Sequence, residues 1–102
     1  MSTPEGLLTA ACVRFMQKQR DAGKPIFWLK IHGHAAQRRG EPDLDIVIAG
    51  RALKIELKKK GGKPTSIQVY RMKQWESAGA TTACVDSIEE FRVIIMQALE
   101  RS

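Results

Sequence analysis

Apolar residues recur along this chain with two different spacings, and each spacing predicts one kind of element. Near the N-terminus, four of them are three or four residues apart, as on one side of a helix: Leu8, Ala11, Cys12 and Phe15. Thr3 followed by Pro4 is typical of a helix N-terminus, and Gly23 with Pro25 ends the helix. The chain therefore begins with an amphipathic helix.

The rest of the chain divides into short apolar stretches and two longer segments with helical spacing. The short stretches predict strands at residues 26–31, 43–48, 52–58 and 82–85. The longer segments predict helices at residues 65–78 and 87–100. Three consecutive strands suit an antiparallel meander, and a fourth reached through a helix should run parallel to the third with a right-handed crossover. The order αβββαβα predicts an α/β sandwich around a mixed four-stranded sheet.

The length of the chain predicts a single domain, and its net charge predicts an acidic partner. The 102 residues form one domain, residues 1–102, and the net charge is +6. A basic surplus favours nucleic acid as the partner, although a charge run is also typical of a solvated surface. Between Lys54 and Lys73 the only acidic residue is Glu56. A single glutamate inside such a basic segment requires a separate explanation.

Strand alternation groups three charged residues at one end of the predicted sheet. Successive side chains of a strand point to opposite faces. In the third strand, Glu56 and Lys58 alternate with apolar residues and therefore face away from the core. The same alternation puts Asp43 and Asp45 of the second strand on the face of Glu56. A short hairpin then brings Asp43 close to Glu56 and Lys58.

Two carboxylates and an ammonium group in this arrangement have two interpretations. Carboxylate oxygens suit Mg²⁺ or Mn²⁺, and a bound ion of this kind can activate a water and stabilise charge on a phosphate. Lys58 would then assist that water or neutralise the transition state. Alternatively, the same residues form an exposed ion-pair ladder that contributes little stability. Spacing alone leaves both interpretations open.

The order of motifs resembles one nuclease family. Gly40-Glu41-Pro42-Asp43-Leu44 and, thirteen residues after Asp43, Glu56-Leu57-Lys58 are similar to the PD-(D/E)xK pattern. Four further features are similar to the virus-type replication–repair nuclease (VRR-NUC) branch: Gly50-Arg51, a Lys/Gly loop at 59–63, Thr65-x-x-Gln68, and W-x-x-A-G at 75–79. The resemblance runs from Glu5 to the last helix. It implies a restriction-endonuclease-like fold and a nuclease activity.

The resemblance also implies a metal site and a catalytic lysine. Asp43 and Glu56 would bind the metal, with the backbone carbonyl of Leu57 completing the inner shell, and Lys58 would be catalytic. Glu5 resembles a glutamate that the first helix of this family contributes to the metal. Its spacing also places it on the apolar side of that helix. The alternative for Glu5 is a favourable interaction with the helix dipole alone.

Other residues would order the site or hold the substrate. Gln68 matches a glutamine of the family that orders the active site, and Thr65-x-x-Gln68 is also a capping box, so both roles are compatible. Asp45 departs from the family pattern, and we interpret it as a charged residue of the sheet face. Polar and basic residues around the site would hold backbone phosphates: Lys30, His34, Gln37, Arg38, Arg39, Lys59, Lys60 and Lys63.

The remaining conspicuous side chains have ordinary interpretations. His32 and His34 lack a third ligand of matching type, which argues against a metal pair. Trp28 and Trp75 are more typical of a core or an interface than of base stacking. The two cysteines lie in apolar stretches and are expected to be reduced thiols rather than a disulfide.

These observations predict a DNA endonuclease dependent on Mg²⁺ or Mn²⁺ that acts in replication, recombination or repair. Stand-alone members of the family resemble Holliday-junction resolvases, so we expect branched DNA as substrate, and a homodimer because one small domain reaches one scissile phosphate. The alternative is a non-catalytic nucleic-acid-binding module with the same fold; an RNA-binding protein is less favoured without an aromatic sheet surface. The chain has no apolar run near the ~20 residues of a membrane span and no secretory signal. We therefore expect the protein to be located in the cytoplasm of a bacterium or phage-infected host.

Overall fold

The computed structural model describes residues 3–31 and 39–101, and its elements follow the predicted order. The first half contains α1 (Pro4–Asp21), β1 (Ile26–Lys30), β2 (Leu44–Ile48) and β3 (Arg51–Leu57). The second half contains α2 (Ser66–Ser77), β4 (Thr81–Val85) and α3 (Ile88–Glu100). The predicted bounds agree with these to within one residue. Among the described residues, no helix is long and apolar enough to cross a membrane.

Each of the three helices begins at a hydroxyl-bearing residue. Thr3, Thr65 and Ser87 accept a hydrogen bond from the backbone N–H three residues further on. This bond satisfies one of the N–H groups that the first turn of a helix leaves without a partner. In α1, Pro4 occupies the first helical position, where its missing N–H costs nothing. Local chemistry therefore sets where the helices start.

The sheet has the strand order β1-β2-β3-β4. The first two pairings are antiparallel and the third is parallel, which confirms the predicted meander and crossover. A two-residue turn joins β2 to β3, with positive φ at both Ala49 and Gly50, as a type I′ hairpin requires. The register pairs Leu44 with Ile55. Continuing it by one residue places Asp43 opposite Glu56.

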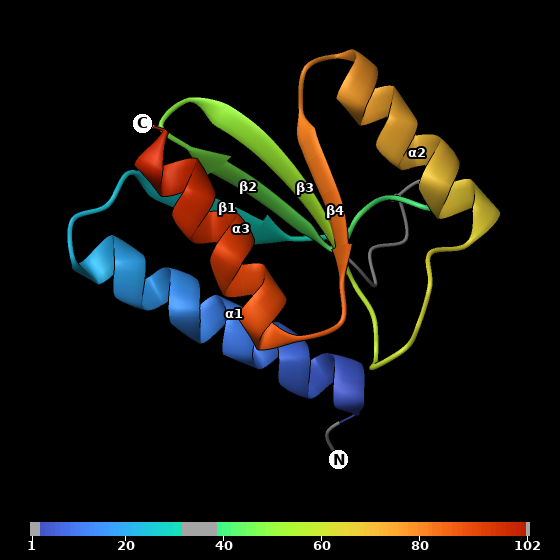
Figure 1. The fold of residues 1–102 in the computed structure, drawn as a ribbon, viewed down its shortest axis with the longest axis horizontal. Helices are drawn as coiled ribbons and strands as arrows, with labels where there is room; N and C mark the ends of the chain where they lie inside the picture. The colour runs from blue at the N-terminus through green and yellow to red at the C-terminus, as the bar shows by residue number, and fades with distance from the viewer. Residues whose placement is uncertain (1–2, 32–38, 102) are drawn as a thin grey trace.

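The main core lies between one face of the sheet and two helices. In Figure 1, α1 and α3 lie side by side across that face. Their apolar sides meet the alternate inward residues of β2 and β3, as the periodicities predicted. The fully buried side chains of the helices are Cys12, Met16, Phe91 and Ile95. This layer holds the ends of β2 and β3 firmly in place.

The opposite face of the sheet is only partly covered. Helix α2 packs beside β4, and its Trp75 ring lies 3.8 Å from the Lys54 ammonium. Lys54 and Glu56 are consequently buried, at 8% and 3% exposed. An exposed ion-pair ladder is therefore wrong for this face, because α2 closes over it. Glu56 instead lies in a site largely screened from water.

Candidate active site

Asp43 lies directly before β2 and contacts the end of β3. Its Oδ2 atom accepts a hydrogen bond of 2.8 Å from the backbone N–H of Leu57. Its own carbonyl accepts one from the N–H of Ile31, just beyond β1. The side chain is thus tied to a strand that is distant in sequence. The predicted convergence of Asp43 with the end of β3 is present in the structure.

Glu56 has one occupied and one unoccupied oxygen. Its Oε2 accepts a hydrogen bond of 2.8 Å from the Gln68 side-chain amide and lies 3.6 Å from the Lys58 ammonium. Its Oε1 is buried and has no hydrogen-bond partner among the described residues. Leaving a buried acceptor unsatisfied costs about 1–3 kcal/mol. Such an atom is the strongest indication of a missing ligand in this part of the chain.

The protonation of Glu56 reflects this environment. Burial and, after it, the nearby charge of Asp43 raise the pKa of Glu56 from 4.5 to about 8, although Lys58 opposes the change. Desolvation and a neighbouring like charge both disfavour the ionised form. A cation between the two carboxylates would remove this penalty. Strongly raised carboxyl pKa values are typical of functional sites.

Lys58 follows Glu56 by two residues and is anchored through its backbone. Its N–H donates to the carbonyl of Val85 at 2.9 Å, which continues the β3–β4 pairing past the last strand residue. The side chain is 17% exposed, so the ammonium is held near Glu56 but remains reachable from solvent. This is the position that strand alternation predicted.

Gln68 makes two contacts at once. Its Oε1 accepts a hydrogen bond from the Thr65 N–H at 2.8 Å, and its own N–H donates to the Thr65 hydroxyl, which completes the capping box. Its Nε2 donates to Glu56. Because Thr65 holds the oxygen, the amide can present only its NH₂ group to Glu56. The capping box and the hydrogen bond to Glu56 therefore coexist in the geometry.

The donor set fits a divalent metal ion with few protein ligands. Asp43 and Glu56 supply adjacent carboxylates, and Mg²⁺ is usually held by one or two carboxylates, with waters and substrate phosphate filling the remaining positions. Within residues 3–31 and 39–101, no three His, Cys, Asp or Glu side chains gather into a metal cluster. The structure therefore brings together two of the three expected carboxylate ligands, and Glu5 does not join them directly.

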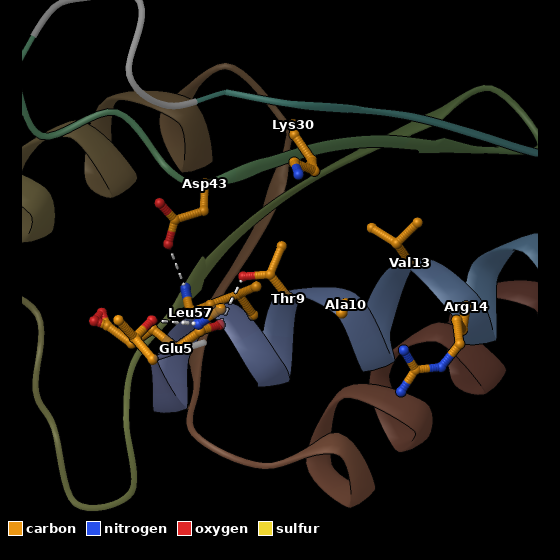
Figure 2. A pocket seen from close by; sticks show the side chains of 10 residues that line it. Glu5, Thr9, Ala10, Val13, Arg14, Lys30, Asp43 and Leu57 are labelled. Atoms are coloured by element: carbon orange, nitrogen blue, oxygen red, sulfur yellow. Dashed lines mark hydrogen bonds between the residues drawn. The ribbon is translucent and has the colours of Figure 1, made fainter. Parts of the chain in front are cut away.

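Glu5 lies at the edge of the same pocket. A pocket of about 740 Å³ extends between α1 and the ends of the strands, and its lining includes Glu5, Asp43 and Leu57. Figure 2 shows Glu5 and Leu57 at one end of it, with Lys30 on the opposite wall. Glu5 is exposed, so its expected place on the buried side of the helix is wrong. Glu5 lies in the first turn of α1, beside the open pocket.

The segment before Asp43 is fixed against α2. Gly40 has φ +83°, and a Cβ added there would lie 2.8 Å from the carbonyl oxygen of Ile67. The Trp75 indole N–H donates to Glu41 Oε1 at 2.9 Å, and the Arg71 guanidinium donates to the carbonyl of Arg39 at 3.1 Å. These contacts explain why a glycine precedes the acidic motif and why a tryptophan stands in α2. They aim Asp43 toward Glu56.

Asp45 takes the role expected for it. It forms an ion pair of 2.8 Å with Lys54, its cross-strand partner in the β2–β3 register. Trp75 covers this pair on one side, and Trp28 lies under the guanidinium of Arg20 at 4.8 Å. Both tryptophans are partly buried against neighbouring side chains, as predicted. Asp45 makes no contact with the Asp43–Glu56 pair in any described interaction.

The residues expected to hold phosphates lie in three places. Lys30 ends β1 and lines the pocket. Lys59, Lys60 and Lys63 are exposed on the loop after β3, and Arg39 is exposed beside Gly40. His34, Gln37 and Arg38, like His32, lie outside the described residues. The structure thus leaves five of these eight side chains available on the surface around the site.

Three contributors to the site were not anticipated from the sequence. Asp86 Oδ2 accepts a hydrogen bond from the Gly61 N–H at 2.9 Å and so holds the lysine-rich loop. Cys84 pairs with Glu56 across β3 and β4, and burial, followed by the charge of Glu56, raises the pKa of its thiol. Arg14 of α1 lines the pocket. Its spacing on the helix gave the signal, since it lies four residues after Ala10, which lines the same pocket.

Comparison with known proteins shows which solved structures share this arrangement of elements. No family model matches the sequence, and no curated protein does. Two solved structures match almost the whole chain. One, described as a VRR_NUC domain, has a TM-score of 0.71 and 23% identity over 93% of this chain and 97% of its own. The other, a VRR_NUC domain protein, has a TM-score of 0.80 and 20% identity over 98% and 91%. The chain therefore has the fold of VRR_NUC domains, which confirms the predicted resemblance at the level of the fold.

Proposed function

We propose that this chain is a VRR-NUC-type nuclease that hydrolyses phosphodiester bonds in DNA and depends on Mg²⁺ or Mn²⁺. The observation that carries the proposal is the Asp43–Glu56 pair, because Glu56 is buried and its Oε1 atom has no hydrogen-bond partner among the described residues. A structural ion pair would not leave a carboxylate oxygen unsatisfied in this way. An acidic site inside a basic protein suits a metal that binds together with an anionic substrate.

Each side chain has a defined part in this proposal. Asp43, Glu56 and the Leu57 carbonyl would hold the metal, with Glu5 acting from the pocket edge. A bound Mg²⁺ or Mn²⁺ supplies an activated water and stabilises charge on the phosphate oxygens. Lys58 neutralises part of the negative charge that develops on the reacting phosphate. Gln68 fixes the orientation of the Glu56 carboxylate through its single hydrogen bond.

The basic residues around the site would hold the DNA backbone. Lys30 and Arg39 lie on the side of β1 and the Gly40 segment, and Lys59, Lys60 and Lys63 lie on the loop after β3. Contacts of this kind position a duplex or a branch without reading its sequence. We propose that the cleaved DNA is branched, such as a flap or a four-way junction, in replication, recombination or repair.

We further propose that the protein acts as a homodimer. Phe27, Leu29 and Val47 lie on the face of the sheet that α2 leaves open and are 58%, 54% and 43% exposed, and Tyr70 of α2 is 55% exposed. A second copy related by a two-fold axis would cover these side chains and provide two sites for two strands. Phe27→Ser should halve the mass measured by light scattering. Val93→Ser, which alters an equally exposed valine on α3, should not.

A cleavage assay tests the proposed activity. Linear duplex, flap and four-way-junction DNA would be incubated with the protein in Mg²⁺, in Mn²⁺ and in EDTA. The proposal predicts backbone cleavage in either metal, no cleavage in EDTA, and faster cleavage of branched DNA. Binding without cleavage of any substrate in either metal would favour the alternative, a binding module that retains the nuclease fold.

A further inference from the structure

A second hollow lies next to the active-site pocket, between α1 and α3. It has a volume of about 430 Å³, and Arg14, Lys18 and Arg92 are among the residues that line it. Arg14 also lines the active-site pocket, so the two hollows meet at this side chain. In Figure 2, Arg14 lies far from Asp43 and is turned toward α3. We name this hollow, defined by Arg14, Lys18 and Arg92, the α1–α3 groove.

The charges of the α1–α3 groove have no acidic counterpart. Its lining contains three cationic side chains and no aspartate or glutamate. Among residues 3–31 and 39–101, no ion pair involves Arg14, Lys18 or Arg92. Arg14 and Lys18 are four residues apart on α1, and like charges at this spacing slightly destabilise a helix. Among the described residues, no ion pair offsets this small cost.

One of the three cations is held in place by an aromatic ring. The Arg92 guanidinium lies 5.6 Å from the centre of the Phe15 ring, and Phe15 in turn packs edge-on against Phe91 of the core. A guanidinium stacked on a ring keeps its N–H donors free for another partner. The groove thus presents a preordered donor group from α3 opposite two flexible cations from α1.

We infer that the α1–α3 groove binds backbone phosphates of the same nucleic-acid strand that enters the active site, outside the cleaved position. The inference rests on the proposed nuclease function, because that function places a strand in the neighbouring pocket. The strand would pass from Asp43 along α1 to Arg14 and continue to Lys18 and Arg92. The charged groups of the groove are cations, which contact phosphates and do not read the edges of the bases. Binding there should therefore not depend on base sequence.

The salt dependence of DNA binding tests this inference. The triple variant Arg14→Gln, Lys18→Gln, Arg92→Gln would be compared with the wild-type protein in EDTA, using a fluorescent duplex and a series of salt concentrations. Each lost phosphate contact should flatten the slope of log affinity against log salt by about 0.9. We expect the triple variant to lose two or three such contacts. Its thermal unfolding should shift only slightly downward, through the loss of the Arg92–Phe15 contact, because the cluster contributes no internal ion pair.

A matched control separates this effect from the loss of charge in general. Arg51→Gln also removes an exposed cation, but at the first residue of β3, whereas Asp43 lies opposite Glu56 near the other end of that strand. This variant should keep the wild-type slope. A triple variant with the wild-type slope would overturn the inference. So would a triple variant that loses affinity for an acidic polypeptide while keeping its slope for DNA, since the groove would then serve a protein partner.

The two proposals fail in different ways. Binding in EDTA does not require cleavage, so a flattened slope in the triple variant supports the groove even if no DNA is cut in Mg²⁺ or Mn²⁺. Conversely, the wild-type protein could cleave DNA while the triple variant keeps the wild-type slope. The proposed nuclease function would then stand, and the proposed role of the groove would be wrong.

Discussion

Replacing Glu56 with glutamine should stabilise the metal-free protein at neutral and alkaline pH. Glu56 is 3% exposed, and its pKa is raised from 4.5 to about 8 by burial and by Asp43. The glutamine keeps the shape of the side chain and a carbonyl oxygen that can accept the hydrogen bond from Gln68. It cannot ionise, so the cost of holding a buried negative charge disappears.

The sign and size of this effect follow from the two pKa values. In the unfolded chain Glu56 loses its proton near its ordinary pKa of 4.5, whereas in the folded protein it keeps the proton until about 8. Between these values the unfolded state binds fewer protons, so the stability of the wild-type protein falls as pH rises. One pKa unit corresponds to about 1.4 kcal/mol. The full displacement therefore amounts to ~5 kcal/mol, reached only above the folded pKa.

Urea unfolding in EDTA from about pH 5 to about pH 9 would measure this difference. Glu56→Gln and wild type should be nearly equal in stability at the acid end, and the variant should become progressively more stable toward the alkaline end. Glu100→Gln, an exposed glutamate at the end of α3, serves as the control and should follow the wild-type curve. Added Mn²⁺ should stabilise the wild-type protein and leave Glu56→Gln unchanged. A variant that is less stable than wild type at alkaline pH, or that shows the same pH dependence, would refute the reasoning.

Three further predictions concern the surroundings of this carboxylate. Gln68→Glu preserves the capping box but places a second negative charge beside Glu56, so cleavage should fall about 10–100-fold. The melting temperature should fall as well, because a like charge adds to the cost of ionising the buried Glu56. Lys58→Met should lower the cleavage rate about 10²–10⁴-fold without weakening Mn²⁺ binding measured by calorimetry; a lost Mn²⁺ affinity would contradict the role given to Lys58. Gly40→Ala should destabilise the fold by more than the ~1–2 kcal/mol of a left-handed backbone conformation, because its Cβ would meet Ile67. Gly61→Ala, also at positive φ but with open space around it, should cost only the backbone contribution.

Much of the fold was accessible from the sequence because its determinants are local. Helical and strand periodicities gave the elements, and Thr3 and Thr65 indicated where the first two helices start. The pairing of Asp43 with Glu56 was also accessible, because a two-residue hairpin fixes the register of β2 and β3. Once that turn is set, alternation determines which side chains share a face. The centre of the candidate site is thus a consequence of one short turn.

The features that could not be predicted from the sequence depend on how separate elements pack against one another. Strand alternation placed Lys54 and Glu56 away from the core, but it could not indicate that α2 and Trp75 would bury that face too. Glu5 has helical spacing suited to burial, yet it lies in the first turn of α1 beside the open pocket, and the side chain is exposed. The α1–α3 groove depends on which helices become neighbours on the sheet. None of these features has a signature within a single element.

The most direct test of the central claim compares two aspartates that lie two residues apart. Asp43→Asn and Asp45→Asn each remove one negative charge from the same face of β2, but only Asp43 contacts the end of β3 beside Glu56, whereas Asp45 pairs with Lys54. Both variants and the wild-type protein would be assayed for cleavage of four-way-junction DNA in Mn²⁺. We expect wild type and Asp45→Asn to cut the DNA and Asp43→Asn not to cut it. Cleavage by Asp43→Asn at the wild-type rate would contradict the assignment of this carboxylate pair as the active site.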